Sequence, residues 1–225
     1  MELAERYGAI VDRVATASRA VGRQASEITV VAVSKRQPED RLSALASLGH
    51  RDFGENLIQA WQDRLGLGLP ADLKWHVIGP LQTNKAKFVA RTPPALLHTI
   101  DRASLVDALA RRLGDASPLD VLIQVNVDRE PQKAGCLPEA LDALVDHLRS
   151  TSALRLRGLM TIPQPTQSGA PQSAFAATRT LLESIADRVD GPPILSMGMS
   201  SDFEKAIAEG STMVRIGTAI FGARL

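Results

Sequence analysis

The chain has 225 residues, of which 44% are hydrophobic, and its formal net charge at pH 7 is +1. This length suits one large α/β domain or two small ones, and the nearly neutral charge argues against nucleic acid or an anionic membrane surface as the main partner. Cys136 is the only cysteine, which excludes an intramolecular disulfide and a cysteine-based metal cluster.

Short β-branched runs alternate with amphipathic helical stretches along the chain. The segment 1–24 has charged residues at helical spacing and is expected to form an N-terminal helix. It lacks the apolar core of a signal peptide, and no run is long enough to span a membrane, so we expect a soluble, cytoplasmic protein. Eight candidate strands follow, at 28–35, 51–56, 73–79, 96–101, 119–127, 154–162, 194–199 and 212–222.

This alternation requires parallel strands joined by crossover helices. Eight strands with seven intervening helices predict a single-domain (β/α)8 barrel of the TIM type over residues 28–222, within one domain at 1–225. The last candidate strand runs almost to the C-terminus, so we expect the N-terminal helix to replace the helix that would follow it. A doubly wound open sheet is the alternative fold. The Pro- and Gln-rich segment 163–172 is expected to be a long loop after the sixth strand.

Several familiar site types are absent from the sequence. The glycines of "GTAIFGAR" (217–224) lack the Lys-Ser/Thr pair of a phosphate-binding P-loop, and no G-x-G-x-x-G follows a strand. The four histidines lack metal-site spacing, so we expect no metal. A single cysteine near a loop is usually inert, which argues against thiol catalysis.

Lys35 closes the apolar run "VAVSK" at the predicted carboxyl end of the first strand. In a barrel this end of the strands carries the active site. Burial or nearby positive charge lowers the pKa of a lysine and prepares it to form an imine. A solvated lysine at a strand end is the alternative, and position alone favours it.

The segment "MGMSSDFEKAIAEG" (197–210) follows the seventh strand. Its Gly198 permits close backbone approach, and Ser201 with Glu204 fits a capping box for a helix that begins at Asp202. Exposed N–H groups at a helix start form an anion site, and barrels commonly hold phosphate after the seventh and eighth strands. Ordinary helix capping is the alternative.

Arg215 lies within the otherwise apolar eighth strand, so its charge needs an ion-pair partner or a ligand. Gly217 and Thr218 follow it and offer a bare backbone and a hydroxyl beside the predicted phosphate site. Together with Lys35, these features describe a pocket for an aldehyde that carries a phosphate ester. Pyridoxal 5′-phosphate is the obvious candidate.

The chain also resembles the pyridoxal phosphate homeostasis proteins, a single-domain family related to the barrel of alanine racemase. The resemblance spans almost the whole chain and is carried by "VAVSK", "FGENLIQ", "WHVIGPLQTNKAK", "QVNVDREPQKAGC", "LRGLMTIP" and "LSMGMSSDFEKAIAEGSTMVRIGTAIFGAR".

The resemblance implies a role for each candidate residue. Lys35 would form the aldimine with the cofactor, and Arg215 would face its pyridine nitrogen. The phosphate would be bound by Ser200, Gly217 and Thr218, with Ser201 as a neighbouring candidate. Asn56 and His76 would line the pocket, although Asn56 could instead cap a helix and His76 could be a hydrogen-bonded core residue. Glu130 and Lys133 match a family loop to which the sequence assigns no function.

The sequence favours a cofactor carrier over an enzyme. An arginine opposite the pyridine nitrogen leaves that nitrogen unprotonated, which weakens the cofactor as an electron sink. Racemisation also needs a second base, and the only tyrosine, Tyr7, lies in the predicted N-terminal helix. We therefore expect a monomeric protein of intracellular pyridoxal phosphate homeostasis that passes the cofactor to apo-enzymes. The alternatives are an amino-acid racemase, with His76 or a water as second base, and a phosphosugar-type barrel enzyme.

Overall fold

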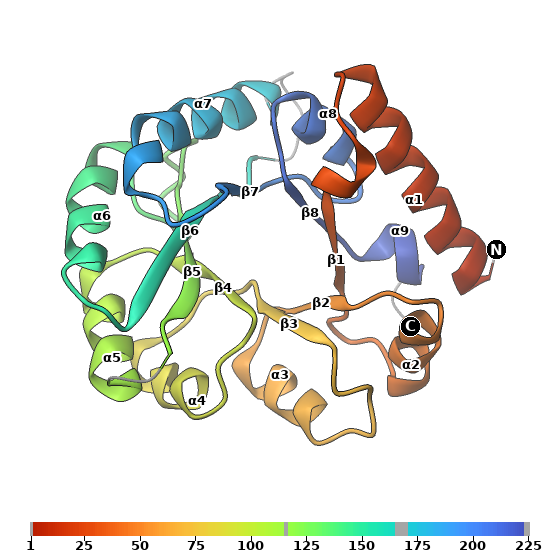
Figure 1. Cartoon of the computed structure of the whole chain (residues 1–225), viewed down its shortest axis with the longest axis horizontal. Coiled ribbons are helices and arrows are strands. Elements are labelled where there is room, and N and C mark those ends of the chain that lie inside the picture. The colour runs from red at the N-terminus through yellow and green to blue at the C-terminus, as the bar shows by residue number, and fades with distance from the viewer. Residues whose placement is uncertain (1, 115–116, 165–170, 223–225) are drawn as a thin grey trace.

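Eight parallel strands close into a barrel in the computed structural model, which describes residues 2–114, 117–164 and 171–222 (Figure 1). Each strand pairs with the next along the chain, and β8 closes the ring by pairing with β1, with Val31 opposite Arg215. The strands are β1 Thr29–Val33, β2 Asp52–Glu55, β3 Lys74–Val77, β4 Leu96–Ile100, β5 Leu119–Gln124, β6 Leu154–Met160, β7 Ile194–Ser196 and β8 Met213–Ile216. Each lies within one of the eight predicted segments, so the predicted (β/α)8 barrel is confirmed.

Helices surround the barrel. They are α1 Leu3–Ala20, α2 Glu39–Ser47, α3 Ile58–Leu65, α4 Ala86–Arg91, α5 Ala103–Leu113, α6 Leu141–Arg149, α7 Pro171–Ser184, α8 Phe203–Ala208 and α9 Thr218–Phe221. Four short 3₁₀ turns lie at Ala25–Glu27, Thr83–Lys85, Pro138–Ala140 and Ala186–Arg188. In the described part of the chain, no helix is both long enough and apolar enough to cross a membrane.

The C-terminal end of the barrel differs from the prediction. The eighth strand was expected to extend over 212–222, but β8 ends at Ile216 and the short helix α9 follows it. A helix therefore does follow the last strand. Helix α1 packs against α9, α8 and α2, and so covers the outside of the barrel at the closing strands (Figure 1). Of the predicted loop 163–172, residues 165–170 lie outside the described residues, and Pro171 already begins α7.

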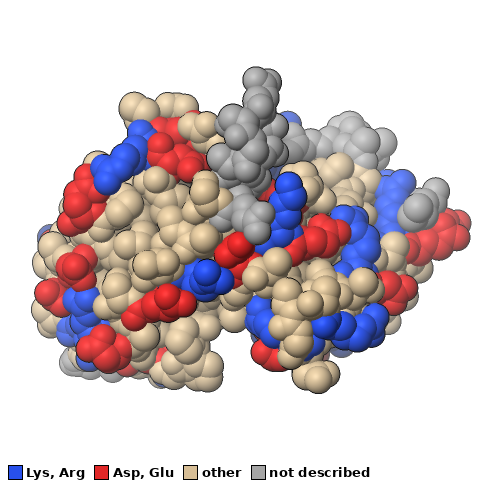
Figure 2. Space-filling model, turned by 90° about the horizontal axis from the view of Figure 1, so that it is seen from above, with Lys and Arg blue, Asp and Glu red and all other residues tan. Residues whose placement is uncertain are grey.

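Strand alternation divides the core into two parts. A small apolar cluster fills the barrel interior, and a larger one lies between the strands and the helices. In β8, Met213 belongs to the inner cluster, whereas Val214 and Ile216 belong to the outer one. Because side chains of a strand alternate between its faces, Arg215 points into the barrel with Met213. On the face shown in Figure 2, acidic and basic side chains lie interspersed.

Close backbone packing joins the ends of β2 and β3. A β-carbon added at Gly79, just after β3, would overlap the main-chain oxygen of Asn56, just after β2. The absence of a side chain at Gly79 therefore lets the two segments touch at the rim where Asn56 lies.

We expect Gly79→Ala to lower the free energy of unfolding by about 3 kcal/mol, because the Asn56 backbone must move. Urea denaturation measures this change. Gly8→Ala is the matched control: Gly8 lies in α1 with open space around its α-carbon, so alanine should stabilise the helix by about 0.5–1 kcal/mol. Equal stability of Gly79→Ala and the unmodified protein would contradict the packing argument.

Candidate functional site

Lys35 lies in a tight turn at the carboxyl end of β1. The strand ends at Val33, two residues earlier than predicted, and the Gln37 N–H donates to the Ser34 carbonyl at 3.0 Å to close the turn. Arg36 adopts a left-handed conformation with φ of 59° within it. Lys35 is half-buried at this end of the strand.

A buried carboxylate behind the barrel wall holds this turn in place. Glu55, at the end of β2, accepts a hydrogen bond of 2.8 Å from the Ser34 hydroxyl and pairs with Arg64 of α3 at 3.3 Å. Arg64 also donates to the Gln37 carbonyl at 2.5 Å. Burial raises the pKa of Glu55, and the bonds from Ser34 and Arg64 oppose that rise. Both flanks of the Lys35 turn are thus anchored to α3.

Ser200 and the start of α9 meet on the same rim. The Ala219 N–H points to the Ser200 hydroxyl oxygen at 3.4 Å, which joins the loop after β7 to the segment after β8. Gly217 precedes α9, and a β-carbon there would come within 3.3 Å of the Val33 carbonyl at the end of β1. Thr218, the first residue of α9, is exposed. The structure therefore brings Ser200, Gly217 and Thr218 to the strand end that carries Lys35.

The predicted capping box of α8 is wrong. Asp202, not Ser201, is the N-cap residue of α8, and its carboxylate accepts a hydrogen bond from the Met199 N–H at 2.7 Å. Glu204 instead pairs with Arg13 of α1, at 2.8 Å from its Nε. Ser201 is exposed in the preceding turn. Because Asp202 brings negative charge to the start of α8, the N–H groups of α9 are the better donors for an anion.

Gly198 has a φ of 95° and packs against Ala206, as the predicted close approach requires.

Arg215 is buried inside the barrel just below this rim, with 4% of its surface exposed. Its Nη1 donates to the carbonyl and the hydroxyl oxygen of Ser196, at 2.8 and 2.7 Å, and its Nη2 donates to the Thr161 carbonyl at 2.9 Å. Burial lowers the pKa of Arg215 to about 10, a change that nearby Asp202 opposes, so the guanidinium stays charged at neutral pH. Among the described residues Arg215 forms no ion pair, and neutral acceptors hold its charge.

The two remaining candidates lie at different depths. Asn56 is half-buried directly after β2, at the rim. His76 lies within β3 and is 3% exposed, with one ring nitrogen 3.0 Å from His98 and the other 3.1 Å from Asp52. Both nitrogens of His76 are engaged inside the barrel, so the structure favours its role as a hydrogen-bonded core residue over direct contact with a ligand.

The rim has the chemistry that an anionic aldehyde requires. Its donors are the Lys35 amine, the Ser200 hydroxyl and the N–H groups at the start of α9, with the Arg215 guanidinium beneath them. The bare α-carbon of Gly217 lets the start of α9 approach Val33 closely. These groups fit pyridoxal 5′-phosphate, which carries an aldehyde, a phosphate and a ring nitrogen. Within the described ranges, no group of three His, Cys, Asp or Glu side chains could hold a metal ion.

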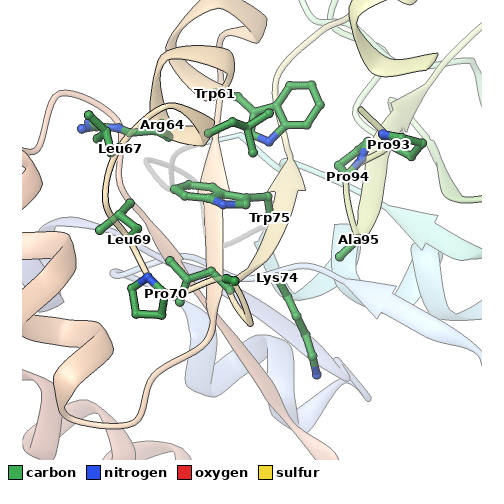
Figure 3. A pocket seen from close by; sticks show the side chains of 13 residues that line it. Trp61, Arg64, Leu67, Leu69, Pro70, Lys74, Trp75, Pro93, Pro94 and Ala95 are labelled. Carbon is green, nitrogen blue, oxygen red and sulfur yellow. The ribbon is translucent and has the colours of Figure 1, made fainter. Parts of the chain in front are cut away.

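A separate cavity of about 360 Å³ lies outside the barrel wall (Figure 3). Trp61 of α3 and Trp75 of β3 lie close together in it, with Pro93 and Pro94 on the opposite side. None of the candidate site residues lines this cavity. Cys136 does not offer an alternative site either, because burial raises the pKa of its thiol to about 12.

Sequence reasoning missed the groups that support the site. His98 and Ser196 lie inside the barrel next to Arg215, and Glu55 lies behind Lys35. The histidine in "LLHTI" is a polar residue within a fully buried strand, and that signal could have identified His98. The link between Glu55 and Ser34 spans 21 residues and has no local signature.

Comparisons with known proteins show the family of this chain. The family model described as "Alanine racemase, N-terminal domain" matches residues 7–225. The chain is 42% identical to the pyridoxal phosphate homeostasis protein of Pseudomonas aeruginosa, over 99% of this chain and 96% of the relative. It is 41% identical to that of Escherichia coli K12, over 99% and 97%. The chain belongs to the pyridoxal phosphate homeostasis protein family.

Solved structures extend this family likeness. The structure of PipY from Synechococcus elongatus with PLP bound is 33% identical, with a TM-score of 0.81, and the match covers 98% of this chain and 100% of PipY. Alanine racemase from Corynebacterium glutamicum is 16% identical with a TM-score of 0.66, and the match covers 96% of this chain and 61% of the racemase. At that identity the racemase shows only that the barrel fold is shared.

His98 should make the stability of this protein depend on pH. Burial, with His76 and Arg215 nearby, holds the pKa of His98 well below 6.5, so it stays neutral in the folded state. In the unfolded chain it takes up a proton below pH 6.5. The unfolded state then binds more protons, so the free energy of unfolding falls as the pH decreases, by up to about 1.4 kcal/mol per pH unit.

Urea denaturation between pH 5 and 7 measures this slope. We expect His98→Gln to be less stable than the unmodified protein at pH 7 and to show a shallower slope below pH 6.5. His147→Gln is the control, because His147 is 38% exposed and pairs with Asp107 on the surface. The explanation fails if His98→Gln and the unmodified protein have the same slope.

Proposed function

We propose that this protein binds pyridoxal 5′-phosphate as an aldimine of Lys35 and serves the intracellular homeostasis of that cofactor, as a carrier that releases it to apo-enzymes. The observation that carries the proposal is the meeting of Lys35, Ser200 and Gly217 on one rim above Arg215. PipY, which matches this chain over its whole length, has PLP bound, which supports the choice of ligand.

Each residue of the rim has a distinct task in this proposal. The Lys35 amine condenses with the aldehyde and releases water, a bond that hydrolysis reverses. Ser200, Thr218 and the N–H groups at the start of α9 bind the phosphate, with exposed Ser201 beside them. Asn56 lines the edge of the pocket next to β2. The turn anchored by Glu55 and Arg64 limits the freedom of Lys35 before the cofactor arrives.

Arg215 determines what the bound cofactor can do. Pyridoxal phosphate supplies an electron sink, which is deepest when its ring nitrogen is protonated. Arg215 is held below the rim by Ser196 and Thr161 and stays protonated, so it would donate a hydrogen bond to the ring nitrogen of a bound cofactor and transfer no proton to it. An unprotonated ring suits storage of the cofactor better than catalysis.

Lys35→Ala should abolish covalent attachment of the cofactor. The unmodified protein, incubated with pyridoxal phosphate, should turn yellow, and borohydride should fix the cofactor to Lys35, which peptide mass mapping identifies. Lys205→Ala is the control, because Lys205 is an exposed lysine on α8. Attachment to another lysine, or a Lys35→Ala protein with an unchanged visible spectrum, would contradict the proposal.

An amino-acid racemase is the second candidate, since the barrel resembles that of alanine racemase. A racemase needs a base on each face of its substrate. Tyr7 donates to His50 at 3.2 Å, near the amino-terminal end of β2 and away from the Lys35 rim, and both ring nitrogens of His76 are engaged. These positions favour the carrier.

Loaded protein should therefore convert L-alanine and other L-amino acids to their D-isomers far more slowly than an enzyme. Chiral chromatography after incubation measures the D-isomer formed, with Lys35→Ala as the background. Turnover on the order of 1 s⁻¹ or faster would establish the racemase instead.

A further inference from the structure

A line of polar side chains crosses the barrel from Asp52 to Arg215. His76 Nε2 lies 3.1 Å from Asp52 Oδ1, and His76 Nδ1 lies 3.0 Å from His98 Nε2. His98 Nδ1 lies 3.0 Å from Ser196 Oγ, which accepts the 2.7 Å bond from Arg215 Nη1. The five residues come from β2, β3, β4, β7 and β8, so the line spans the interior instead of following one strand.

The two ends determine the direction of every bond in this line. A guanidinium only donates, and an ionised carboxylate only accepts. The hydrogen bond from His76 lowers the pKa of Asp52 against the effect of burial, so Asp52 is ionised at neutral pH. While both histidines are neutral, His76 then donates from Nε2 and accepts at Nδ1, and His98 donates from its own Nε2. Ser196 donates to His98 Nδ1 and accepts from Arg215.

The reverse direction is excluded while both histidines are neutral. If His98 donated from Nδ1 to Ser196, its Nε2 would have to accept from His76 Nδ1. The Nε2 lone pair of His76 would then face the Asp52 carboxylate, and two acceptors would repel one another. His76, His98 and Ser196 are all nearly or fully buried, with no more than 3% exposed, so water cannot easily replace the lost bonds.

The Asp52 end of this line lies at the amino-terminal end of the strands, on the side of the barrel opposite to Lys35. Its side chain is 23% exposed and lines a cavity of about 350 Å³ together with Tyr7 and His50. His50 Nε2 donates to the Asp52 carbonyl at 2.9 Å, and the Tyr7 hydroxyl donates to His50 Nδ1 at 3.2 Å. The charged and titratable groups that act on the two ends are Lys74, His50 and Tyr7 at Asp52, and Asp202 at Arg215.

We propose that Asp52, His76, His98 and Ser196 are positioning residues for Arg215, linked in a one-directional chain of hydrogen bonds that couples the charge of Asp52 to the cofactor ring. The chain orients Ser196 so that its oxygen faces Arg215, and the guanidinium is held in one plane. The part that concerns the cofactor rests on the proposed function, whereas the part that concerns the hydrogen bonds does not.

The first experiment uses the protein without cofactor. Long-range ¹H–¹⁵N NMR at pH 7.5 reports which nitrogen of each histidine carries the proton. His98 and His76 should each carry a proton on Nε2 and accept a hydrogen bond at Nδ1, and Ser196→Ala should shift the Nδ1 resonance of His98, which loses its donor. A proton on His98 Nδ1 in the unmodified protein means that the chain does not run from Arg215 to Asp52, and overturns the proposal.

The second experiment uses protein loaded with pyridoxal phosphate. Asp52→Asn removes the charge but keeps an acceptor for His76. The surroundings of the cofactor then become more positive, so the visible pH titration of the imine nitrogen should move to lower pH, by about half a unit. Asp72→Asn is the matched control, because Asp72 pairs with Arg51 at 2.6 Å on the surface and takes no part in the chain. Equal titrations for Asp52→Asn and the unmodified protein overturn the coupling.

A double-mutant cycle distinguishes coupling through the hydrogen-bond chain from a direct electrostatic effect of the Asp52 charge. In Ser196→Ala protein, the titration shift caused by Asp52→Asn should fall by at least half, since the chain is broken beside Arg215. A shift of undiminished size shows that the charge acts through space and overturns the positioning role. If the loaded protein has no visible band at all, the proposed function fails, while the NMR result still decides the hydrogen-bond chain.

Discussion

The burial of one positive charge organises the interior of this barrel. Arg215 lies on the inner face of β8, and its guanidinium is held by Ser196 at the end of β7 and by the Thr161 carbonyl just after β6. A buried charge without hydrogen bonds costs far more free energy than a domain can offset. The ends of β6, β7 and β8 must therefore lie close enough for these acceptors to reach Arg215. This requirement holds together the half of the rim that contains Ser200 and Gly217.

The other half of the rim depends on groups outside the barrel. Ser34 and Gln37 flank Lys35, and both are tied through Glu55 and Arg64 to α3. The turn that carries Lys35 is thus positioned by contacts on the far side of the strand, where the helices pack.

Much of this arrangement could be predicted from the sequence. The eight strands and their parallel order follow from the alternation of β-branched runs with helical stretches, and the special role of Arg215 follows from its place in an otherwise apolar strand. The six sequence segments that carry the family resemblance include residues of most of these strands and of several loops that follow them. The predictions failed where two local structures compete for the same residues: "TAIF" suits a strand as well as the helix α9 that it forms, and Asp202 caps α8 in place of Ser201.

The sequence by itself determined which side of its own strand each residue occupies, because that depends only on the alternation of side chains. Which residues then meet across the barrel was decided by the tertiary structure, since those contacts depend on how the strands are staggered when β8 closes onto β1. His76 illustrates the difference: its sequence position allowed a place in the pocket, and closure instead put it between Asp52 and His98. Lys35 and Gly217, 182 positions apart in the numbering (217 minus 35), lie on one rim for the same reason.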